Sequence, residues 1–170
     1  RASELGAAVN VGRLRGSLIP AIPQETALSW MYQAFVLLAK RAEKLGTRIL
    51  LETVAYPFCN VINTTLQGIE AIQKVGSQAF RLMLDVFSMN MEDPSIKEAF
   101  AKAFPYLDHV HLCDANRLAP GMGKFDFTYL LGCLRRSGYH GYVSVECFQV
   151  PDKESALEQS TKVLMPLVKS

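Results

Sequence analysis

The chain has 170 residues, of which 49% are apolar and 20% are charged, and its formal net charge is +2. This composition is ordinary for a globular protein and excludes a disordered chain. Lysine and arginine are scattered, so no basic stripe indicates nucleic acid as a partner. No apolar stretch reaches the roughly 20 residues of a membrane span, and no signal-peptide pattern opens the chain. We therefore expect a cytoplasmic protein with no membrane partner.

The four cysteines have no CxxC spacing, which argues against a zinc knuckle. They are Cys59, Cys113, Cys133 and Cys147. Two of them lie at expected strand ends, where small buried thiols are common. The sequence therefore predicts free, buried cysteines in preference to a disulfide framework.

The first half of the chain predicts a helix end, a strand and a long helix. The opening segment RASELGAA begins with Arg1, where a complete chain would have Met, and is typical of the last turn of a helix that ends at Gly6. We therefore expect a preceding segment. Residues 8–12 (AVNVG) predict a strand, and an amphipathic pattern over 27–45 predicts a helix that ends at Gly46.

Strands and helices continue to alternate along the rest of the chain. Further strands are expected at residues 48–53, 79–86, 107–114 and 141–148. Further helices are expected from Asn60 or Asn63 to residue 76, and over residues 93–104, 127–137 and 153–169. Asp93 can cap the second of these helices, with Pro94 at its first position.

Five strand–helix units predict an α/β fold with right-handed crossovers and a parallel sheet. No glycine-rich phosphate turn follows the first strand, and polar residues end four different strands, a pattern typical of a (β/α)8 TIM barrel. A complete barrel needs about 250 residues. We therefore expect a partial (β/α)8 TIM barrel of about five βα units.

Four polar residues lie at the ends of short apolar runs: Glu52 in ILLE, Asp85 in LMLD, His111 in HVHL and Glu146 in VSVE. Each carboxylate alone can cap the next helix or pair with a buried arginine. Together, several like charges at one barrel mouth would repel one another unless a cation neutralised them. Three carboxylates and one imidazole are typical ligands of a divalent metal. The sequence therefore predicts a metal site made of these four residues.

His109 and His111 share one side of their strand because side chains alternate in β structure. Val110 and Leu112 then point to the other side. One histidine can be a ligand and the other its neighbour, or one can be a hydrogen-bonded core residue.

Several segments together resemble one family of enzymes. They are ILLET, NVINTTLQGIEAI, LMLDVFSMN, HVHLCDANRLAPGMGKFDF and GYVSVECF. They are similar to the sugar phosphate isomerase/epimerase family, which has the xylose-isomerase-like barrel and includes the ketose 3-epimerases. The most specific part is the pattern HxHxxDxNRxAPGxGxxDF. Measured against this family, residues 1–170 form a single domain that corresponds to strands four to eight, with strands one to three missing.

The resemblance implies a divalent cation, Mn, Mg or Co, held by the residues that match Glu52, Asp85, His111 and Glu146. Oxygen-rich ligation with one imidazole suits these ions better than structural zinc. The implied substrate is a small carbohydrate, a sugar or sugar phosphate, which is isomerised or epimerised. Glu52 and Glu146 are the implied catalytic pair, which exchanges protons with a substrate carbon from opposite faces through a cis-enediolate.

Five residues are candidates for substrate binding: Arg117, His109, Ser88, Arg13 and Arg15. Arg117 matches a family arginine that contacts substrate oxygens, and a plain salt bridge is its alternative role. Arg13 and Arg15 share one side of GRLRG if the strand continues there. They can then reach a substrate phosphate or acidic group, or they can tie the barrel rim together.

Two positions depart from the ketose 3-epimerases. Ser88 stands where those enzymes usually have a substrate-contacting histidine, and Phe58 stands where they often have a glutamate. The sequence therefore predicts an altered surface for substrate recognition around a retained metal site.

Other functions remain open at this point. A five-stranded piece has two open edges that invite association, so we expect a homo-oligomer if the chain is not a fragment. The alternative to an enzyme is a non-catalytic half-barrel that serves binding or assembly, or a truncated, inactive fragment. A metal-dependent endonuclease of the same superfamily is less favoured, because its multi-metal sites need more than the three histidines present.

Overall fold

The computed structural model describes residues 1–168, in which five parallel strands form one sheet. The strands are β1 (Val9–Val11), β2 (Ile49–Glu52), β3 (Phe80–Asp85), β4 (Leu107–Leu112) and β5 (Tyr142–Val145). They lie in chain order, and each strand pairs in parallel with the next. The predicted α/β fold with a parallel sheet is confirmed.

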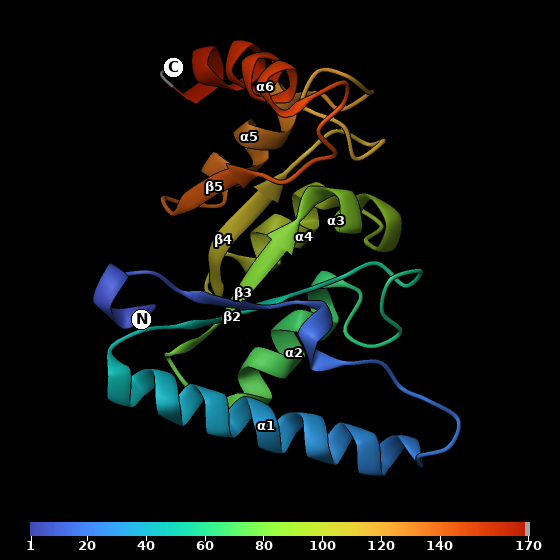
Figure 1. Ribbon diagram of the computed structural model, residues 1–170, viewed down its shortest axis with the longest axis vertical. Helices are drawn as coiled ribbons and strands as arrows, with labels where there is room; N and C mark the ends of the chain where they lie inside the picture. Colours follow the sequence, from blue (N-terminus) through green and yellow to red (C-terminus); the bar gives the residue numbers. More distant parts are fainter. Residues whose placement is uncertain (169–170) are drawn as a thin grey trace.

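Six α-helices and two short 3₁₀ turns accompany the sheet. They are η1 (Ser3–Leu5), η2 (Arg13–Arg15), α1 (Gln24–Leu45), α2 (Thr65–Val75), α3 (Val86–Glu92), α4 (Ile96–Ala103), α5 (Phe127–Arg136) and α6 (Lys153–Val168). Figure 1 shows α1 at one end of the molecule and α6 at the other, with α2, α4 and α5 between them. Helices therefore cover one face of the sheet in the order of its strands.

The core lies between this helical layer and the sheet. Leu51, Leu82 and Val110 supply it from three neighbouring strands, and all three are fully buried. Phe35 of α1 packs on Phe80 with ring centroids 5.1 Å apart. Burial of each such side chain stabilises the fold by about 1.5–3 kcal/mol. Since side chains alternate along a strand, the residues between these apolar positions face away from the helices.

Gly68 allows α2 to lie close to the sheet. A Cβ atom at this position would be 2.7 Å from Leu82 Cδ1 and 2.7 Å from Thr53 Cγ2. Gly68→Ala should therefore lower the free energy of unfolding by about 1–3 kcal/mol, because overpacking outweighs the higher helix propensity of alanine. Thermal unfolding followed by circular dichroism measures this.

Gly132→Ala in α5 is the matched control, because its Cβ would approach only the flexible end of Arg136, at 3.0 Å. This control should unfold at the same temperature as the parent protein or slightly higher. Equal stabilisation by both alanines would contradict the tight packing of α2.

Two predicted helix starts are wrong. The helix after β2 begins at Thr65 and not at Asn60 or Asn63, because Thr64 caps it in a reciprocal pair with Gln67. Asn63 instead donates from Nδ2 to the Val54 carbonyl at 2.7 Å and holds the loop that precedes the helix. The long first helix begins at Gln24, three residues before the predicted start.

The segment after β3 also differs from the prediction. The chain turns directly into α3, a helix that was not predicted, and Ser95 caps the following α4. Asp93, the predicted cap, accepts hydrogen bonds from the backbone N–H and hydroxyl of Thr65 at 3.0 Å and 2.6 Å. It therefore joins α2 to the α3–α4 connection. The predicted end of the last helix, Lys169, lies outside the described residues.

Within residues 1–168, no helix combines the length and apolarity that crossing a membrane requires. Cytoplasmic localisation stays a prediction. All four cysteines are free thiols, of which Cys59, Cys113 and Cys133 are buried.

Candidate metal centre

Four predicted ligands meet at the carboxyl edge of the sheet. Glu52 and Asp85 are the last residues of β2 and β3, His111 is the penultimate residue of β4, and Glu146 follows β5 directly. One ligand atom from each residue lies within 4.8 Å of the others. Their spacing and oxygen-rich chemistry are suited to holding a metal ion. We call these four residues the quartet.

His111 is the centre of the quartet. Its Nδ1 lies 3.2 Å from Glu52 Oε1 and 3.2 Å from Glu146 Oε2. Burial lowers the pKa of His111, but its hydrogen bonds to the two carboxylates outweigh burial and raise that pKa to about 9. The hydrogen bond between His111 and Glu146 is the main reason that the pKa of Glu146 falls to about 2, although burial opposes this fall. Without metal, the raised pKa of His111 favours the protonated ring between the side chains of Glu52 and Glu146.

Arg117 closes the other side of the quartet. Its guanidinium lies 2.5 Å from Asp85 Oδ2 and also donates to Glu146 Oε2. Burial raises the pKa of Asp85 above its ordinary value, and the charge and hydrogen bond of Arg117 limit the rise. Asp85 also accepts the N–H of Phe87 at 2.8 Å and caps α3. Both alternative roles of a strand-end carboxylate, as a cap and as an arginine partner, thus occur at Asp85.

Asp114 holds the loop that presents Arg117, and the sequence analysis did not single it out. Its carboxylate accepts backbone N–H groups of Ala115, Gly121 and Phe125 at 2.8, 2.9 and 3.0 Å. Burial raises the pKa of Asp114, but these hydrogen bonds outweigh it and lower the pKa below the ordinary value. The carbonyl of Asp114 accepts the N–H of Arg117 at 2.8 Å. The signal that could have identified Asp114 is its place as the first residue of the DANR motif.

Asn10 is a second residue that the sequence analysis missed. Its Nδ2 donates to Glu52 Oε2 at 2.8 Å, while Oε1 of the same carboxylate lies next to His111. Asn10 lies in β1, at register position Leu50 of β2. The contact therefore fixes the orientation of Glu52 from the neighbouring strand.

The two arginines of GRLRG do not share one side of a strand, because the segment forms the 3₁₀ turn η2. All five N–H groups of Arg15 can be accounted for by hydrogen bonds to the backbone carbonyls of Gly12, Glu52, Val61 and Ile62. These contacts favour the rim-tying role for Arg15. Arg13 is exposed and lines the cavity in front of Glu52.

The remaining candidates lie close to the quartet. His109 and His111 are neighbours with ring centroids 5.4 Å apart, and Nε2 of His109 lies 2.8 Å from Ser144 Oγ. Ser88 is buried, and its Oγ accepts the N–H of Ala55 at 3.3 Å. Contact of either residue with a substrate stays a prediction.

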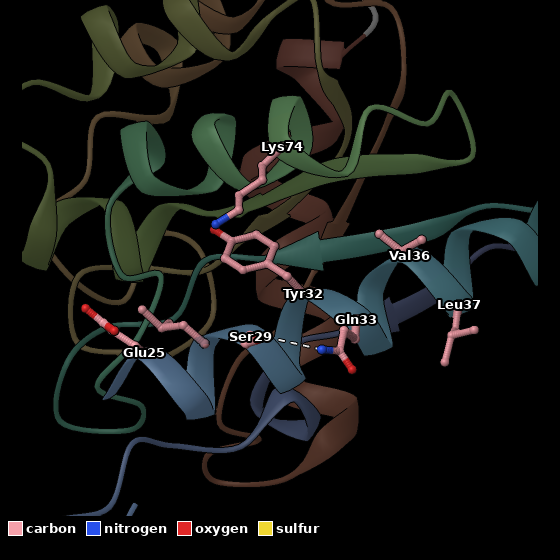
Figure 2. Close-up of a pocket in the computed structure, with 8 residues that line it drawn as sticks. Glu25, Ser29, Tyr32, Gln33, Val36, Leu37 and Lys74 are labelled. Carbon is pink, nitrogen blue, oxygen red and sulfur yellow. Dashed lines mark hydrogen bonds between the residues drawn. The ribbon is translucent and has the colours of Figure 1, made fainter. Parts of the chain in front are cut away.

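A cavity of about 310 Å³ opens on the quartet, and we call it the site cavity. It is lined by Arg13, Glu52, Val54, Phe58, Asp85, Phe87, Ser88, Arg117, Glu146 and Phe148. A larger hollow of about 770 Å³ lies between α1 and Lys74 of α2, where Tyr32 and Lys74 approach each other (Figure 2). That hollow contains none of the quartet, so we assign the site to the smaller cavity.

The charge on His111 predicts how pH acts on the metal-free protein. A pKa of about 9 in the folded state exceeds the unfolded value of about 6.5. The stability that this difference gives is complete below about pH 6.5 and is lost as pH rises towards 9. Metal binding requires neutral His111. Thermal unfolding should therefore show a melting temperature that falls from pH 6.5 to 8.5 without metal, and a stabilisation by Mn²⁺ that grows over the same range. The opposite trend would contradict the protonated His111.

A family model, described as the xylose isomerase-like TIM barrel, matches residues 1–167 of the chain. The probable ketose 3-epimerase of Synechocystis is 32% identical over 126 residues, which cover 74% of this chain and 44% of that protein. The D-psicose 3-epimerase of Ruminiclostridium cellulolyticum is 36% identical over 110 residues, which cover 65% and 38%. The inosose isomerase of Halalkalibacterium halodurans is 30% identical over 136 residues, which cover 74% and 48%. The chain thus spans less than half the length of these relatives.

Solved structures confirm the predicted partial TIM barrel. The D-psicose 3-epimerase of Clostridium cellulolyticum in complex with D-tagatose superposes with a TM-score of 0.86 over 99% of this chain and 66% of that chain. The 3-keto-D-glucoside 4-epimerase of Escherichia coli gives a TM-score of 0.85 over the same fractions. Both are 24% identical to the chain and therefore show the fold alone. The resemblance based on the HxHxxDxNR pattern is confirmed. The chain belongs to the xylose isomerase-like TIM barrel family.

Proposed function

We propose that the site cavity belongs to a divalent-metal-dependent isomerase or epimerase of a small sugar or sugar phosphate. One observation carries the proposal: three carboxylates and one imidazole from four strands converge within 4.8 Å. Such a cluster has a high electrostatic cost unless a cation shares it. Relatives of the chain are named ketose 3-epimerases and inosose isomerase, which is consistent with this reaction class.

Glu52 and Glu146 are the proposed acid–base pair. They approach His111 Nδ1 from two different strands, each at 3.2 Å. A substrate between them can lose a carbon-bound proton to one carboxylate and regain a proton from the other, through a cis-enediolate. Glu52 is buried and oriented by Asn10, whereas the Glu146 side chain is 49% exposed. The two carboxylates therefore differ in their access to solvent protons.

The proposed ion is Mn, Mg or Co, held by the quartet of Glu52, Asp85, His111 and Glu146. When bound, it supplies the Lewis-acid charge that stabilises developing negative charge on substrate oxygens. We assign to Arg117, which contacts two of the carboxylates, the role of donating to the same oxygens. Its guanidinium also opposes the rise that burial causes in the pKa of Asp85, which favours the ionised form that a cation binds.

Solvent exchange tests the function. The protein, metal-loaded and checked by elemental analysis, is incubated in D₂O with a panel of ketoses and ketose phosphates. Deuterium should enter one carbon next to the carbonyl of at least one panel member, and removal of the metal by a chelator should stop it. A protein that binds no divalent ion and exchanges no panel member would rule out the proposed function.

A second candidate is a non-catalytic module that serves binding or assembly. It is favoured by the β5 edge, where a groove of about 650 Å³ between β5 and α6 exposes Leu157 and Val168. Exposed apolar edges favour association between protein chains. The same edge therefore supports both this candidate and the expected homo-oligomer. Light scattering that shows a clean monomer of normal stability would exclude the homo-oligomer, and metal-stimulated turnover would exclude the non-catalytic module.

A further inference from the structure

We propose that the substrate of this site carries an anionic group, a carboxylate or a phosphate, which Arg13 binds. This inference rests on the proposed function and narrows its substrate class from any hydroxy-carbonyl compound to an anionic one.

Arg13 is a cation without a partner in the described part of the chain. Its side chain makes no hydrogen bond or ion pair there, in contrast to Arg15 and Arg117. It lines the site cavity together with Glu52 and Glu146, and it also lines the adjoining hollow of about 490 Å³ in front of Asn10. The guanidinium is therefore available to a ligand that reaches the quartet.

The carboxylates of the quartet are engaged by other groups than Arg13. Arg117 pairs with Asp85 and Glu146, and Asn10 donates to Glu52. Arg13 therefore lines the cavity with its guanidinium open to the anionic group of a ligand.

Three aromatic rings share the cavity wall with Arg13. Phe58, Phe87 and Phe148 line the cavity, and the rings of Phe58 and Phe87 are 6.3 Å apart. These rings offer the Arg13 guanidinium no carboxylate or carbonyl as a partner within the protein. An arginine fork matches carboxylate and phosphate geometry in a bidentate manner.

Calorimetric titration of the metal-loaded protein tests the inference without turnover. The probes are an uncharged ketose, the same ketose as its terminal phosphate, and a ketose acid with a terminal carboxylate. At least one anionic probe should bind about 10- to 100-fold more tightly than the uncharged ketose, and the stronger of the two identifies the anion.

Arg13→Gln should remove this preference for anionic probes and change the affinity for the uncharged ketose little. Arg13→Lys, which keeps the positive charge, should retain part of the preference. Arg41→Gln, at an exposed position of α1, is the matched control and should keep the full preference. Equal affinities for anionic and uncharged probes, or a preference that survives Arg13→Gln, would overturn the inference. If the protein prefers anionic probes but exchanges no deuterium, the anion-binding role of Arg13 is supported and the proposed reaction is contradicted. If it exchanges deuterium but shows no anion preference, the proposed reaction is supported and the role of Arg13 is contradicted.

Discussion

Replacement of Glu146 by glutamine is expected to lower metal-stimulated deuterium exchange by about 10³-fold while the fold remains intact. An amide cannot accept the substrate proton, and a positioned general base contributes about 10²- to 10⁴-fold. The side chain is 49% exposed, but its carboxylate pairs with His111 and Arg117, so the variant should melt at a moderately lower temperature and remain folded under the assay conditions. Exchange rates at saturating Mn²⁺, with the bound metal checked by elemental analysis, and thermal unfolding measure these two effects.

Glu158→Gln is the matched control for this variant, because Glu158 is an exposed glutamate of α6 outside the quartet. It should keep parental exchange and metal content. Glu52→Gln should show a similar loss of exchange, because the two carboxylates serve opposite faces of the substrate carbon. If Glu146→Gln kept exchange within about threefold of the parent, the assignment of Glu146 to proton transfer would be wrong.

Asp114→Asn is expected to lower both stability and activity. The carboxylate accepts three backbone N–H groups, and an amide would turn one oxygen into a donor that faces an N–H. Loss of a charge-assisted hydrogen bond and the unpaired N–H together should cost about 2–3 kcal/mol, which urea unfolding measures. Because the Asp114 carbonyl fixes Arg117, the variant should also show a lower kcat and an altered pH profile.

Asp126→Asn is the control for Asp114, because Asp126 is an exposed aspartate that caps α5 through the N–H of Tyr129 at 2.9 Å. Asparagine is about as good a helix cap as aspartate, so this variant should lose less than about 1 kcal/mol. Equal and small losses in both variants would show that Asp114 does not position the Arg117 loop.

The quartet could be predicted from the sequence because each member follows a short apolar run. Parallel strands bring their carboxyl ends to one edge, so local patterns in ILLE, LMLD, HVHL and VSVE were enough to bring Glu52, Asp85, His111 and Glu146 together. The helix-facing side of β4 was predictable for the same reason, since Val110 and Leu112 alternate with the histidines and are buried in the core.

Contacts between distant segments were not predictable in this way. Asn10 reaches Glu52 across 42 residues, and Arg15 reaches Val61 across 46. The alternation assumed for Arg13 and Arg15 failed because the chain leaves the strand at Gly12 and turns into η2. Strand periodicity gives side-chain direction only while the strand continues.

The start of α4 was mispredicted, and α3 was missed, because several residues compete as helix caps. Asp93, Ser95 and Asp85 can each cap a helix, and tertiary contacts decide among them. Asp93 is used by Thr65, so Ser95 caps α4, and the paired carboxylate of Asp85 has an oxygen left to cap α3. Asp114 was missed because a buried acid that accepts backbone N–H groups has no periodic signal in the sequence.

Anomalous diffraction from crystals of the protein soaked in Mn²⁺ locates the ion directly. We expect one strong peak at about 2.0–2.3 Å from an oxygen of Glu52, Asp85 and Glu146 and from a ring nitrogen of His111. No peak within reach of these four side chains, or a peak held by other residues while the quartet keeps its ion pairs with Arg117, would contradict a metal centre at this site.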